Sequence, residues 1–181
     1  MVLAGEGKIM LREIDMKDTD NIIRWRNNPN VRSKFCFQET FTNEMHMNWY
    51  NTRVKTGNVV QFIIVDQENN MDIGSVYLRD IDLKNRKAEF GIFIGENIAR
   101  GKGSGTKATK RIIEYGFKEL KLNKIFLRVF ADNLRAIASY KKAGFEEEGI
   151  FKQDVIVNAG EYKDMVFMAI FNKNCIEKGG R

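Results

Sequence analysis

The stretch Glu89-Phe-Gly-Ile-Phe-Ile-Gly-Glu-Asn-Ile-Ala-Arg100-Gly-Lys-Gly-Ser-Gly105 joins an apolar run to a glycine-rich turn. The run over Lys87–Gly95 is rich in isoleucine and phenylalanine, which favours a strand. Beyond the turn, apolar side chains recur at helical spacing, which predicts a helix over Thr106–Glu119 with free N–H groups beginning near Ser104. The segment is therefore expected to fold as a strand, a tight turn and a helix.

The turn has the composition of an anion-binding site. Its glycines leave room for backbone N–H groups to approach a ligand, and they are Gly101, Gly103 and Gly105. The first turn of the helix adds free N–H groups and the positive end of the helix dipole. Arg100 and Lys102 add positive charge at the rim. We expect this arrangement to suit a pyrophosphate.

Two common phosphate-binding motifs fit this glycine-rich turn poorly. A P-loop requires GxxxxGK[ST], and this turn is too short and lacks the terminal Lys-Ser/Thr. A dinucleotide fingerprint requires GxGxxG, and the third glycine is missing. A strand–helix connection without a ligand is a further alternative, but three glycines and two cations exceed what a turn needs.

The segments on either side of this stretch predict an α/β (α+β) fold. Upstream we expect a strand near Lys8–Glu13, a helix from Asp18 to Asn27 that Pro29 ends, a helix over Thr42–Lys55, and strands Val59–Asp66 and Asp72–Arg79. Downstream we expect strand Lys124–Phe130, helix Leu134–Ala143 closed by Gly144, and strands Gly149–Val157 and Tyr162–Phe171. The order β-α-α-β-β-β-α-β-α-β-β predicts one domain over residues 1–172, a mixed sheet with helices on its faces, and a polar tail over 173–181.

Composition excludes several classes of function. A single histidine, His46, and two separate cysteines argue against a metal site and a cysteine nucleophile. No apolar run is long enough to span a bilayer, and residues 1–8 lack the pattern of a secretion signal, so we expect a cytoplasmic protein without a membrane partner. The net charge of +6 is spread along the chain, so it fits a solvated surface with one anion pocket as well as a nucleic-acid surface. We expect no nucleic-acid partner, because no RNA-binding strand motif accompanies the charge.

Two motifs resemble the signatures of the GNAT superfamily of N-acetyltransferases. Arg100, Gly103 and Gly105 match the acyl-CoA loop [QR]xxGx[GA]. About 30 residues downstream, the run from Asn133 to Phe145 matches NxxAxxxYxKxGF. The resemblance implies a GNAT-like, mostly antiparallel central sheet with helices on both faces. It also implies acetyl-CoA as the co-substrate, a small-molecule amine as the acceptor, no metal, and a monomer or homodimer.

The same resemblance implies how the coenzyme would be bound. Backbone amides of the loop would hold the pyrophosphate, with Gly101, Lys102, Gly103, Ser104, Gly105 and Thr106 surrounding it. The backbone at Phe93 and Ile94 would pair with the pantetheine arm. Asn133, Ala136 and Tyr140 fall on one helix face, so Asn133 would bond the pantetheine amides beside Ala136, and Lys142 would lie near the adenosine phosphate.

Two residues are candidates for acid–base catalysis. By its matching position in the second motif, the resemblance implies that Tyr140 is the general acid for the departing thiolate, and the alternative is a tyrosine that only packs its ring. Glu89 shares a strand face with Gly91 and Phe93, where burial would raise its pKa toward that of a base. A surface ion pair is the alternative for Glu89, and a chain of water molecules could then accept the proton.

The acceptor is suggested by four residues, which are Trp25, Arg26, His46 and Trp49; core packing is the alternative for each. The run Trp25-Arg26-Asn27 before Pro29 resembles the Rim-like branch of the superfamily. The same run followed by Glu44-x-His46-x-x-Trp49 also resembles the amino-sugar acetyltransferases of the pseudaminic acid pathway. A nucleotide-linked amino sugar is therefore the expected acceptor. A ribosomal protein N-terminus, a polyamine and an aminoglycoside are alternatives, and the +6 charge argues mildly against a polycation. A non-catalytic acyl-CoA sensor and a small RNA-binding domain are alternatives outside the enzyme class.

Overall fold

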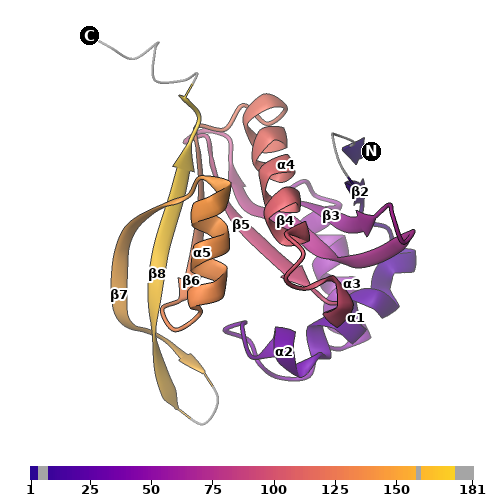
Figure 1. The fold of residues 1–181 in the computed structure, drawn as a ribbon, viewed down its shortest axis with the longest axis horizontal. Helices are drawn as coiled ribbons and strands as arrows, with labels where there is room; N and C mark the ends of the chain where they lie inside the picture. Colours follow the sequence, from indigo (N-terminus) through magenta and orange to yellow (C-terminus); the bar gives the residue numbers. More distant parts are fainter. Residues whose placement is uncertain (4–7, 158–159, 174–181) are drawn as a thin grey trace.

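The computed structural model describes residues 1–3, 8–157 and 160–173. These described residues form one eight-stranded sheet in the order β1-β2-β3-β4-β5-β6-β8-β7 (Figure 1). The strands are β1 Val2–Leu3, β2 Ile9–Glu13, β3 Val59–Asp66, β4 Met71–Asp82, β5 Lys87–Ile94, β6 Lys124–Phe130, β7 Glu146–Val157 and β8 Glu161–Phe171. The helices are α1 Thr19–Asn27, α2 Pro29–Arg32, α3 Asn43–Trp49, α4 Ser104–Lys118 and α5 Leu134–Ala143.

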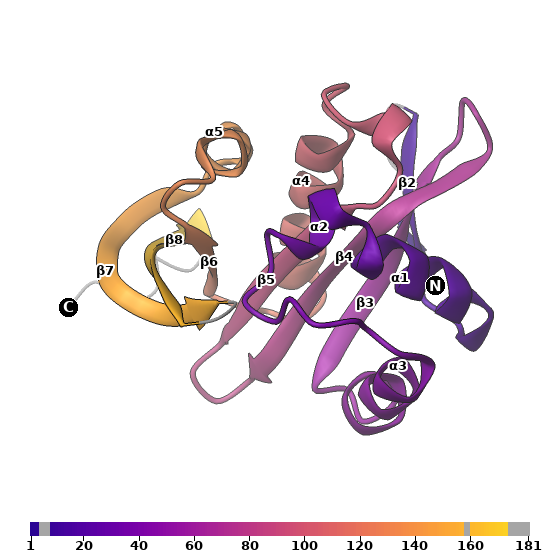
Figure 2. The ribbon, with the colours of Figure 1, turned by 90° about the horizontal axis from the view of Figure 1, so that it is seen from below.

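The sheet is antiparallel except where β5 meets β6. These two strands run parallel, and only three pairs, Lys87↔Lys124, Ala88↔Ile125 and Glu89↔Phe126, join them. Both strands continue beyond the last pair, so they diverge along the rest of their length (Figure 2). The expected mixed, mostly antiparallel GNAT-like sheet is confirmed, and the divergence opens its middle.

Helices cover both faces of the sheet, as Figure 2 shows. Helix α4 places Ala108, Ile112 and Ile113 in a core with one face of β2 to β6, to which Ile137 of α5 also belongs. On the opposite face, Ile22 and Trp25 of α1 form a second core with the alternate residues of β3, β4 and β5. Because successive strand side chains point to opposite faces, β5 directs Phe90 to the first core and Phe93 to the second.

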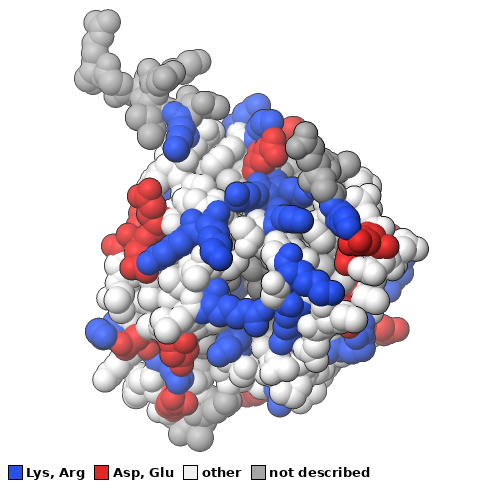
Figure 3. All heavy atoms as spheres, in the orientation of Figure 1, with Lys and Arg blue, Asp and Glu red and all other residues white. Residues whose placement is uncertain are grey.

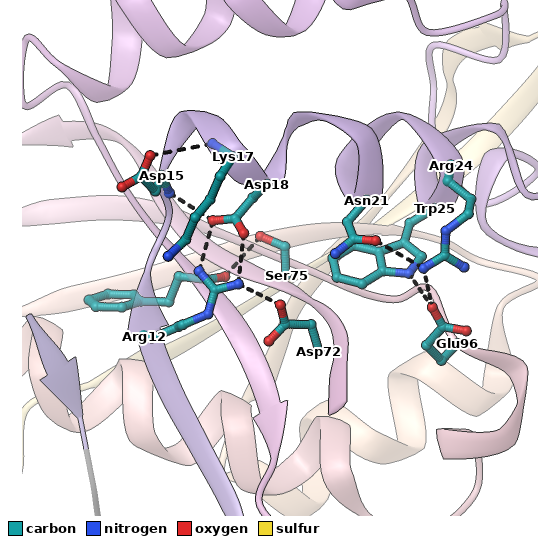
Figure 4. A network of polar contacts seen from close by, with 11 residues as sticks. Arg12, Asp15, Lys17, Asp18, Asn21, Arg24, Trp25, Asp72, Ser75 and Glu96 are labelled. Atoms are coloured by element: carbon teal, nitrogen blue, oxygen red, sulfur yellow. Dashed lines mark hydrogen bonds and ion pairs between the residues drawn. The ribbon is translucent and has the colours of Figure 1, made fainter. Parts of the chain in front are cut away.

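An ion-pair network fastens the start of α1 to the sheet (Figure 4). The guanidinium of Arg12 donates to both carboxylate oxygens of Asp18, at 2.8 and 2.7 Å, and to Asp72 at 2.5 Å. The carboxyl group of Asp18 also accepts from the backbone N–H of Asp15 at 2.8 Å. Its side chain is 3% exposed, so this bridge is better shielded from solvent than a surface pair. The network fixes α1, which forms part of the wall of the site described below.

Most of the expected elements are confirmed, and the differences lie at chain ends and turns. Strands β3 and β6 and helix α5 have the expected bounds. Strand β1 was not expected, because two residues are too few to show a period. Pro29 follows the end of α1, but it also begins α2, since proline suits the first position of a helix. Of the polar tail expected over 173–181, only Lys173 lies within the described residues.

Candidate functional site

A cleft of about 1010 Å³ lies where β5 and β6 diverge. Its lining comes from the glycine-rich turn, from α4 and α5, from β4 to β6, and from the segment between α1 and α3. Figure 3 shows a hollow between Lys and Arg side chains on the face that carries α4 and α5. The two sequence motifs and most of the candidate acceptor residues therefore line one cavity.

The glycine-rich turn has the backbone geometry that an anion site needs. Gly101 and Gly103 have φ angles of 81° and 79°, in the left-handed region that favours glycine. Helix α4 begins at Ser104 with no side-chain cap and no acidic residue in its first turn. The first hydrogen bond at the start of α4 is donated by the Lys107 N–H to the Gly103 carbonyl at 3.1 Å. The N–H groups that precede Lys107 therefore have no hydrogen-bond acceptor within this 15-residue helix. They are available to an anion.

Side chains around the turn hold it against both neighbouring elements. The guanidinium of Arg100 donates to the carbonyl of Ile94 at 3.0 and 3.2 Å, which fastens the turn to the end of β5. Burial lowers the pKa of Arg100, and the nearby charge of Arg135 lowers it further. The hydroxyls of Thr106 and Ser139 lie 2.9 Å apart and join α4 to α5. Lys102 carries an exposed side chain that does not line the cleft, so its expected charge lies outside the cavity wall.

Helix α5 presents its signature residues to the cleft. Asn133, Ala136, Tyr140 and Lys142 all line it. The side-chain oxygen of Asn133 caps α5 by accepting from the Ala136 N–H at 3.4 Å, so the expected bond to a ligand is left to its Nδ2 group. The ring of Tyr140 packs edge-on against Phe90 and Phe145, with centroids 5.8 and 6.1 Å apart.

The Tyr140 hydroxyl has no hydrogen-bond partner among the described residues. Burial raises the pKa of Tyr140, and the nearby Tyr77 hydroxyl adds to the rise. The phenol therefore stays protonated across the physiological range, as a proton donor must. The environment of Tyr140 therefore agrees with both interpretations made from the sequence: its ring packs against its neighbours, and its hydroxyl is available as a general acid.

Glu89 does not have the environment that the sequence predicted. Its carboxylate accepts two hydrogen bonds from Arg79, at 2.8 and 3.2 Å, and two from Arg128, at 3.1 and 3.3 Å. Burial acts to raise the pKa of Glu89, but the hydrogen bonds and charges of the two arginines outweigh it and hold the pKa below its usual value. The expected rise in pKa is wrong, because a strand pattern does not show which cations face the carboxylate.

We expect Glu89→Gln to change kcat by less than about 10-fold, because a carboxylate with a depressed pKa and both oxygens occupied is a poor base. The ion pairs of Glu89 with the two arginines should instead contribute to the free energy of unfolding. A depressed folded pKa stabilises the fold above the unfolded pKa of about 4.3, and this contribution is lost as the pH falls through the folded value. Thermal melts between about pH 5 and pH 3 should therefore show a steeper loss for the parent than for the variant.

The matched control is Glu148→Gln, which removes one exposed pair with Lys124. It should leave both kcat and the pH dependence close to those of the parent. A fall in kcat of about 10² or more for Glu89→Gln, without a fall for the control, would restore Glu89 as the base.

The four candidate acceptor residues fall into different places. Trp25 is 1% exposed, donates from Nε1 to Glu96 at 2.7 Å, and does not line the cleft. Trp49 lines the cleft, and its Nε1 donates to Gln61 at 2.8 Å. Arg26 lines the cleft with its guanidinium 3.6 Å from the ring centroid of Phe35.

His46 belongs to the cleft wall, but its side chain is fully buried. Its Nδ1 lies 3.0 Å from the hydroxyl of Thr19, which donates its own hydrogen to the Met16 carbonyl at 2.6 Å. His46 Nδ1 must therefore be the donor, which leaves Nε2 as an unprotonated acceptor. Burial lowers the pKa of His46, so the ring is neutral at physiological pH.

The cleft residues that the sequence interpretation missed include Tyr77, Arg79 and Arg128. Tyr77 lies across Gly91, where an added Cβ would be 2.3 Å from its ring. Arg79 stands opposite Glu89 in the antiparallel pair β4–β5, so the register of that hairpin could have revealed it. Arg128 comes from the parallel strand β6, and no local signal gives the register between β5 and β6.

The cleft combines the uncapped N–H groups at the start of α4, the part of β5 beyond its three pairs with β6, and a protonated phenol. Such an arrangement can bind a long ligand with an anionic end and protonate a leaving group near the phenol. Among the described residues, no cluster of three or more His, Cys, Asp or Glu side chains could hold a metal ion. In the same part of the chain, no helix is long and apolar enough to cross a bilayer.

Comparisons with known proteins agree with this geometry. The family model for an acetyltransferase (GNAT) domain matches residues 8–146. Spermidine N(1)-acetyltransferase of Vibrio cholerae is 30% identical over 172 residues, which cover 94% of this chain and 97% of that protein. The Escherichia coli K12 enzyme of the same name is 30% identical over 164 residues, covering 90% of this chain and 86% of that protein.

A solved structure gives the same result for the fold. Spermidine N-acetyltransferase from Vibrio cholerae in complex with CoA and spermine matches with a TM-score of 0.83 and 30% identity, covering 91% of this chain and 95% of that one. The coenzyme in that complex is the one that the two motifs implied. The chain therefore belongs to the GNAT acetyltransferase family and is an N-acetyltransferase that uses acetyl-CoA as its co-substrate.

Proposed function

We propose that this chain transfers the acetyl group of acetyl-CoA to a primary amine of a small molecule bound in the cleft. The observation that carries this proposal is that both coenzyme motifs and the segment between α1 and α3 line a single cavity. A coenzyme on the loop side and an acceptor on the opposite side would then meet where β5 and β6 diverge. Known relatives that act on small amines support the reaction class.

In this proposal the glycine-rich loop orients the coenzyme. The amides of Gly103, Ser104 and Gly105 hold the pyrophosphate, and the backbone at Phe93 and Ile94 pairs with the pantetheine arm. The Nδ2 group of Asn133 is the remaining donor for a pantetheine carbonyl. Fixing the thioester in this way converts a bimolecular encounter into a positioned attack.

Chemistry follows from the neutral amine and from Tyr140. The amine nitrogen attacks the thioester carbonyl, and the C–S bond breaks as the carbonyl re-forms. Tyr140 donates its proton to the departing sulfur and recovers one from solvent. Because both Glu89 oxygens are occupied by arginines, we assign the removal of the amine proton to a chain of water molecules rather than to Glu89.

Two observations favour different acceptor amines. Relatives named for spermidine match nearly all of this chain, and they favour the polyamine alternative over the nucleotide-linked amino sugar. The Rim-like branch has weaker support, since a putative ribosomal N-acetyltransferase of Bacillus subtilis covers only 55% of this chain. The charge of the cleft favours an acceptor that carries a negative group, which keeps the amino-sugar nucleotide as the second candidate.

A panel of amines with detection of the released thiol tests the proposal. The panel contains spermidine, a ribosomal N-terminal peptide, an aminoglycoside, glucosamine and a nucleotide-linked amino sugar. Acetyl-CoA-dependent thiol release with at least one amine, and mass-spectrometric detection of the acetylated product, are expected. Tight binding of acetyl-CoA, with no release of the CoA thiol in the presence of any of these amines, would instead identify a sensor.

Location and assembly are part of the same proposal. We place the protein in the cytoplasm, in agreement with the exposed free thiol of Cys36. We keep the expectation of a monomer or homodimer, although a spermidine N-acetyltransferase from Vibrio cholerae has been solved as a dodecamer. Light scattering of the purified protein decides between these states.

A further inference from the structure

The charges that line the cleft are almost all positive. Among the described residues of its wall, seven are cationic, and Glu89 is the one acid. Arg100, Arg135 and Lys142 belong to the glycine-rich turn and to α5, where the coenzyme motifs lie. The remaining cations come from other elements, and they are Arg26, Lys34, Arg79 and Arg128. This second group lies on the acceptor side and is not needed by either motif.

Glu89 holds two of these cations in a fixed arrangement. Arg79 and Arg128 each use Nε and Nη2 to bind its carboxylate, so each guanidinium keeps its Nη1 donors for another ligand. One carboxylate neutralises one of the two positive charges. Asp80 lies 3.8 Å from Arg79, but it also pairs with Arg53 and does not line the cleft. The three cleft residues together therefore retain a positive charge.

Arg26 adds a further charge to the same cleft, near Arg79. No described carboxylate pairs with it, and its guanidinium rests on the rings of Phe35 and Phe41, with centroids 3.6 and 4.9 Å away. Its Nε is buried without a hydrogen-bond partner. Burial lowers the pKa of Arg26, and the charge of Arg79 is close enough to lower it as well. A donor that is buried, unpartnered and near a like charge is stabilised by an anion.

We propose that Arg26, Arg79 and Arg128 form a subsite for an oxyanion on the acceptor, so that the acceptor is an amine that also carries a phosphate or carboxylate. This inference rests on the proposed function, because it assigns that subsite to the molecule that receives the acetyl group. Glu89 acts as the internal counter-ion that positions two of the guanidinium groups. Lys34 stands at the exposed rim of the same side.

The subsite discriminates against polycations. An acceptor ammonium near an unneutralised arginine is repelled, and the repulsion is stronger in a partly buried cleft than in bulk water. A carboxylate or phosphate at the same place gains a similar attraction and forked hydrogen bonds. We therefore expect the chain to differ in acceptor preference from the relative that was solved with spermine.

Binding tests the subsite without any turnover. The protein is first saturated with CoA, so that the loop is filled, and is then titrated with inorganic pyrophosphate in a calorimeter. Saturable binding is expected, weakened about 10-fold or more in both Arg26→Gln and Arg128→Gln. Lys118→Gln, which removes an exposed cation on α4 outside the cleft, should bind pyrophosphate like the parent. No binding, or an equal loss in the Lys118 variant, would overturn the subsite.

Kinetics with matched acceptors tests the substrate class. Propylamine is compared with β-alanine, ethanolamine with O-phosphoethanolamine, and glucosamine with glucosamine 1-phosphate, with spermidine added. We expect kcat/KM to be about 10-fold or more higher for the anionic member of a pair, with an advantage that disappears in Arg26→Gln. The carboxylate and phosphate pairs show which oxyanion is recognised. An equal or higher kcat/KM for spermidine or for the amines that lack an anionic group would contradict the inference.

The outcomes separate the subsite from the reaction. Pyrophosphate binding without acetylation of any amine would support the anion subsite and reject the proposed function. Acetylation of spermidine with no binding of pyrophosphate would support the function and reject the subsite. Unchanged CoA affinity and a single cooperative melting transition in the arginine variants show that they remain folded, although the loss of its pair with Glu89 is expected to lower the melting temperature of the Arg128 variant.

Discussion

Tyr140→Phe is expected to lower turnover by about 10²-fold or more, the usual effect of removing an acid–base group. The variant loses only the hydroxyl, and the ring contacts with Phe90 and Phe145 stay available. Acetyl-CoA affinity should therefore change little, so the loss falls on kcat. Steady-state kinetics with thiol detection, together with a calorimetric titration of acetyl-CoA, separates these two effects.

Tyr115→Phe provides the matched control for this substitution. Tyr115 also packs its ring against a phenylalanine, Phe62 at 5.4 Å, and burial also raises its pKa. It lies on α4 and does not line the cleft. Turnover of the Tyr115 variant should be close to that of the parent. If the Tyr140 variant were equally active, the phenol would have no part in the departure of the thiol.

Gly103→Asp is expected to weaken acetyl-CoA binding by about 10²-fold or more. A carboxylate at this position would face the pyrophosphate, and like charges about 4 Å apart repel by about 4 kcal/mol at an effective dielectric constant of about 20. A side chain at φ 79° also strains the backbone, by about 1–2 kcal/mol. Isothermal calorimetry gives the affinity, and thermal melting shows how much of the change is strain.

Gly57→Asp isolates the effect of charge from that of strain. Gly57 has φ 75° and, like Gly103, has nothing within 4 Å of an added Cβ. It lies outside the cleft, so its substitution carries the same backbone strain without the anion repulsion. The two variants should lose similar stability, but the Gly57 variant should keep the parent affinity for acetyl-CoA. A similar loss of acetyl-CoA affinity in both variants would show that backbone strain, and not charge repulsion, weakens binding in the Gly103 variant.

The fold was predictable where local patterns decide it. The second helix was expected to start at Thr42, and the Thr42 hydroxyl does cap α3 by accepting from the Met45 N–H. The glycine-rich turn and the start of α4 follow from backbone rules that need no tertiary contact. The two-residue strand β1 and the four-residue helix α2 are too short for a period, and they depend on the elements beside them.

The residues that we propose for the coenzyme were more predictable than those that we propose for the acceptor. Its residues lie within two continuous segments, so the spacing in the sequence becomes spacing on one loop and one helix face. The acceptor side is assembled from separate elements, in which Arg79, Glu89 and Arg128 come from three strands. A carboxylate on a strand face indicates a base only if its neighbours are known, and here the neighbours are two arginines that lower its pKa.

The central claim is that the amides between Arg100 and Thr106 bind the diphosphate of the coenzyme and so direct its thioester into the cleft. Calorimetric titration of the unmodified protein with acetyl-CoA and, separately, with S-acetylpantetheine and with S-acetyl-dephospho-CoA tests it most directly, because S-acetylpantetheine lacks the diphosphate and the adenosine, whereas S-acetyl-dephospho-CoA keeps both and lacks only the 3′-phosphate. The account predicts saturable binding of acetyl-CoA and an affinity for S-acetylpantetheine that is lower by about 10²-fold or more, with a smaller loss for S-acetyl-dephospho-CoA. Equal affinities for acetyl-CoA and S-acetylpantetheine, or no heat from acetyl-CoA at millimolar concentration, would contradict it.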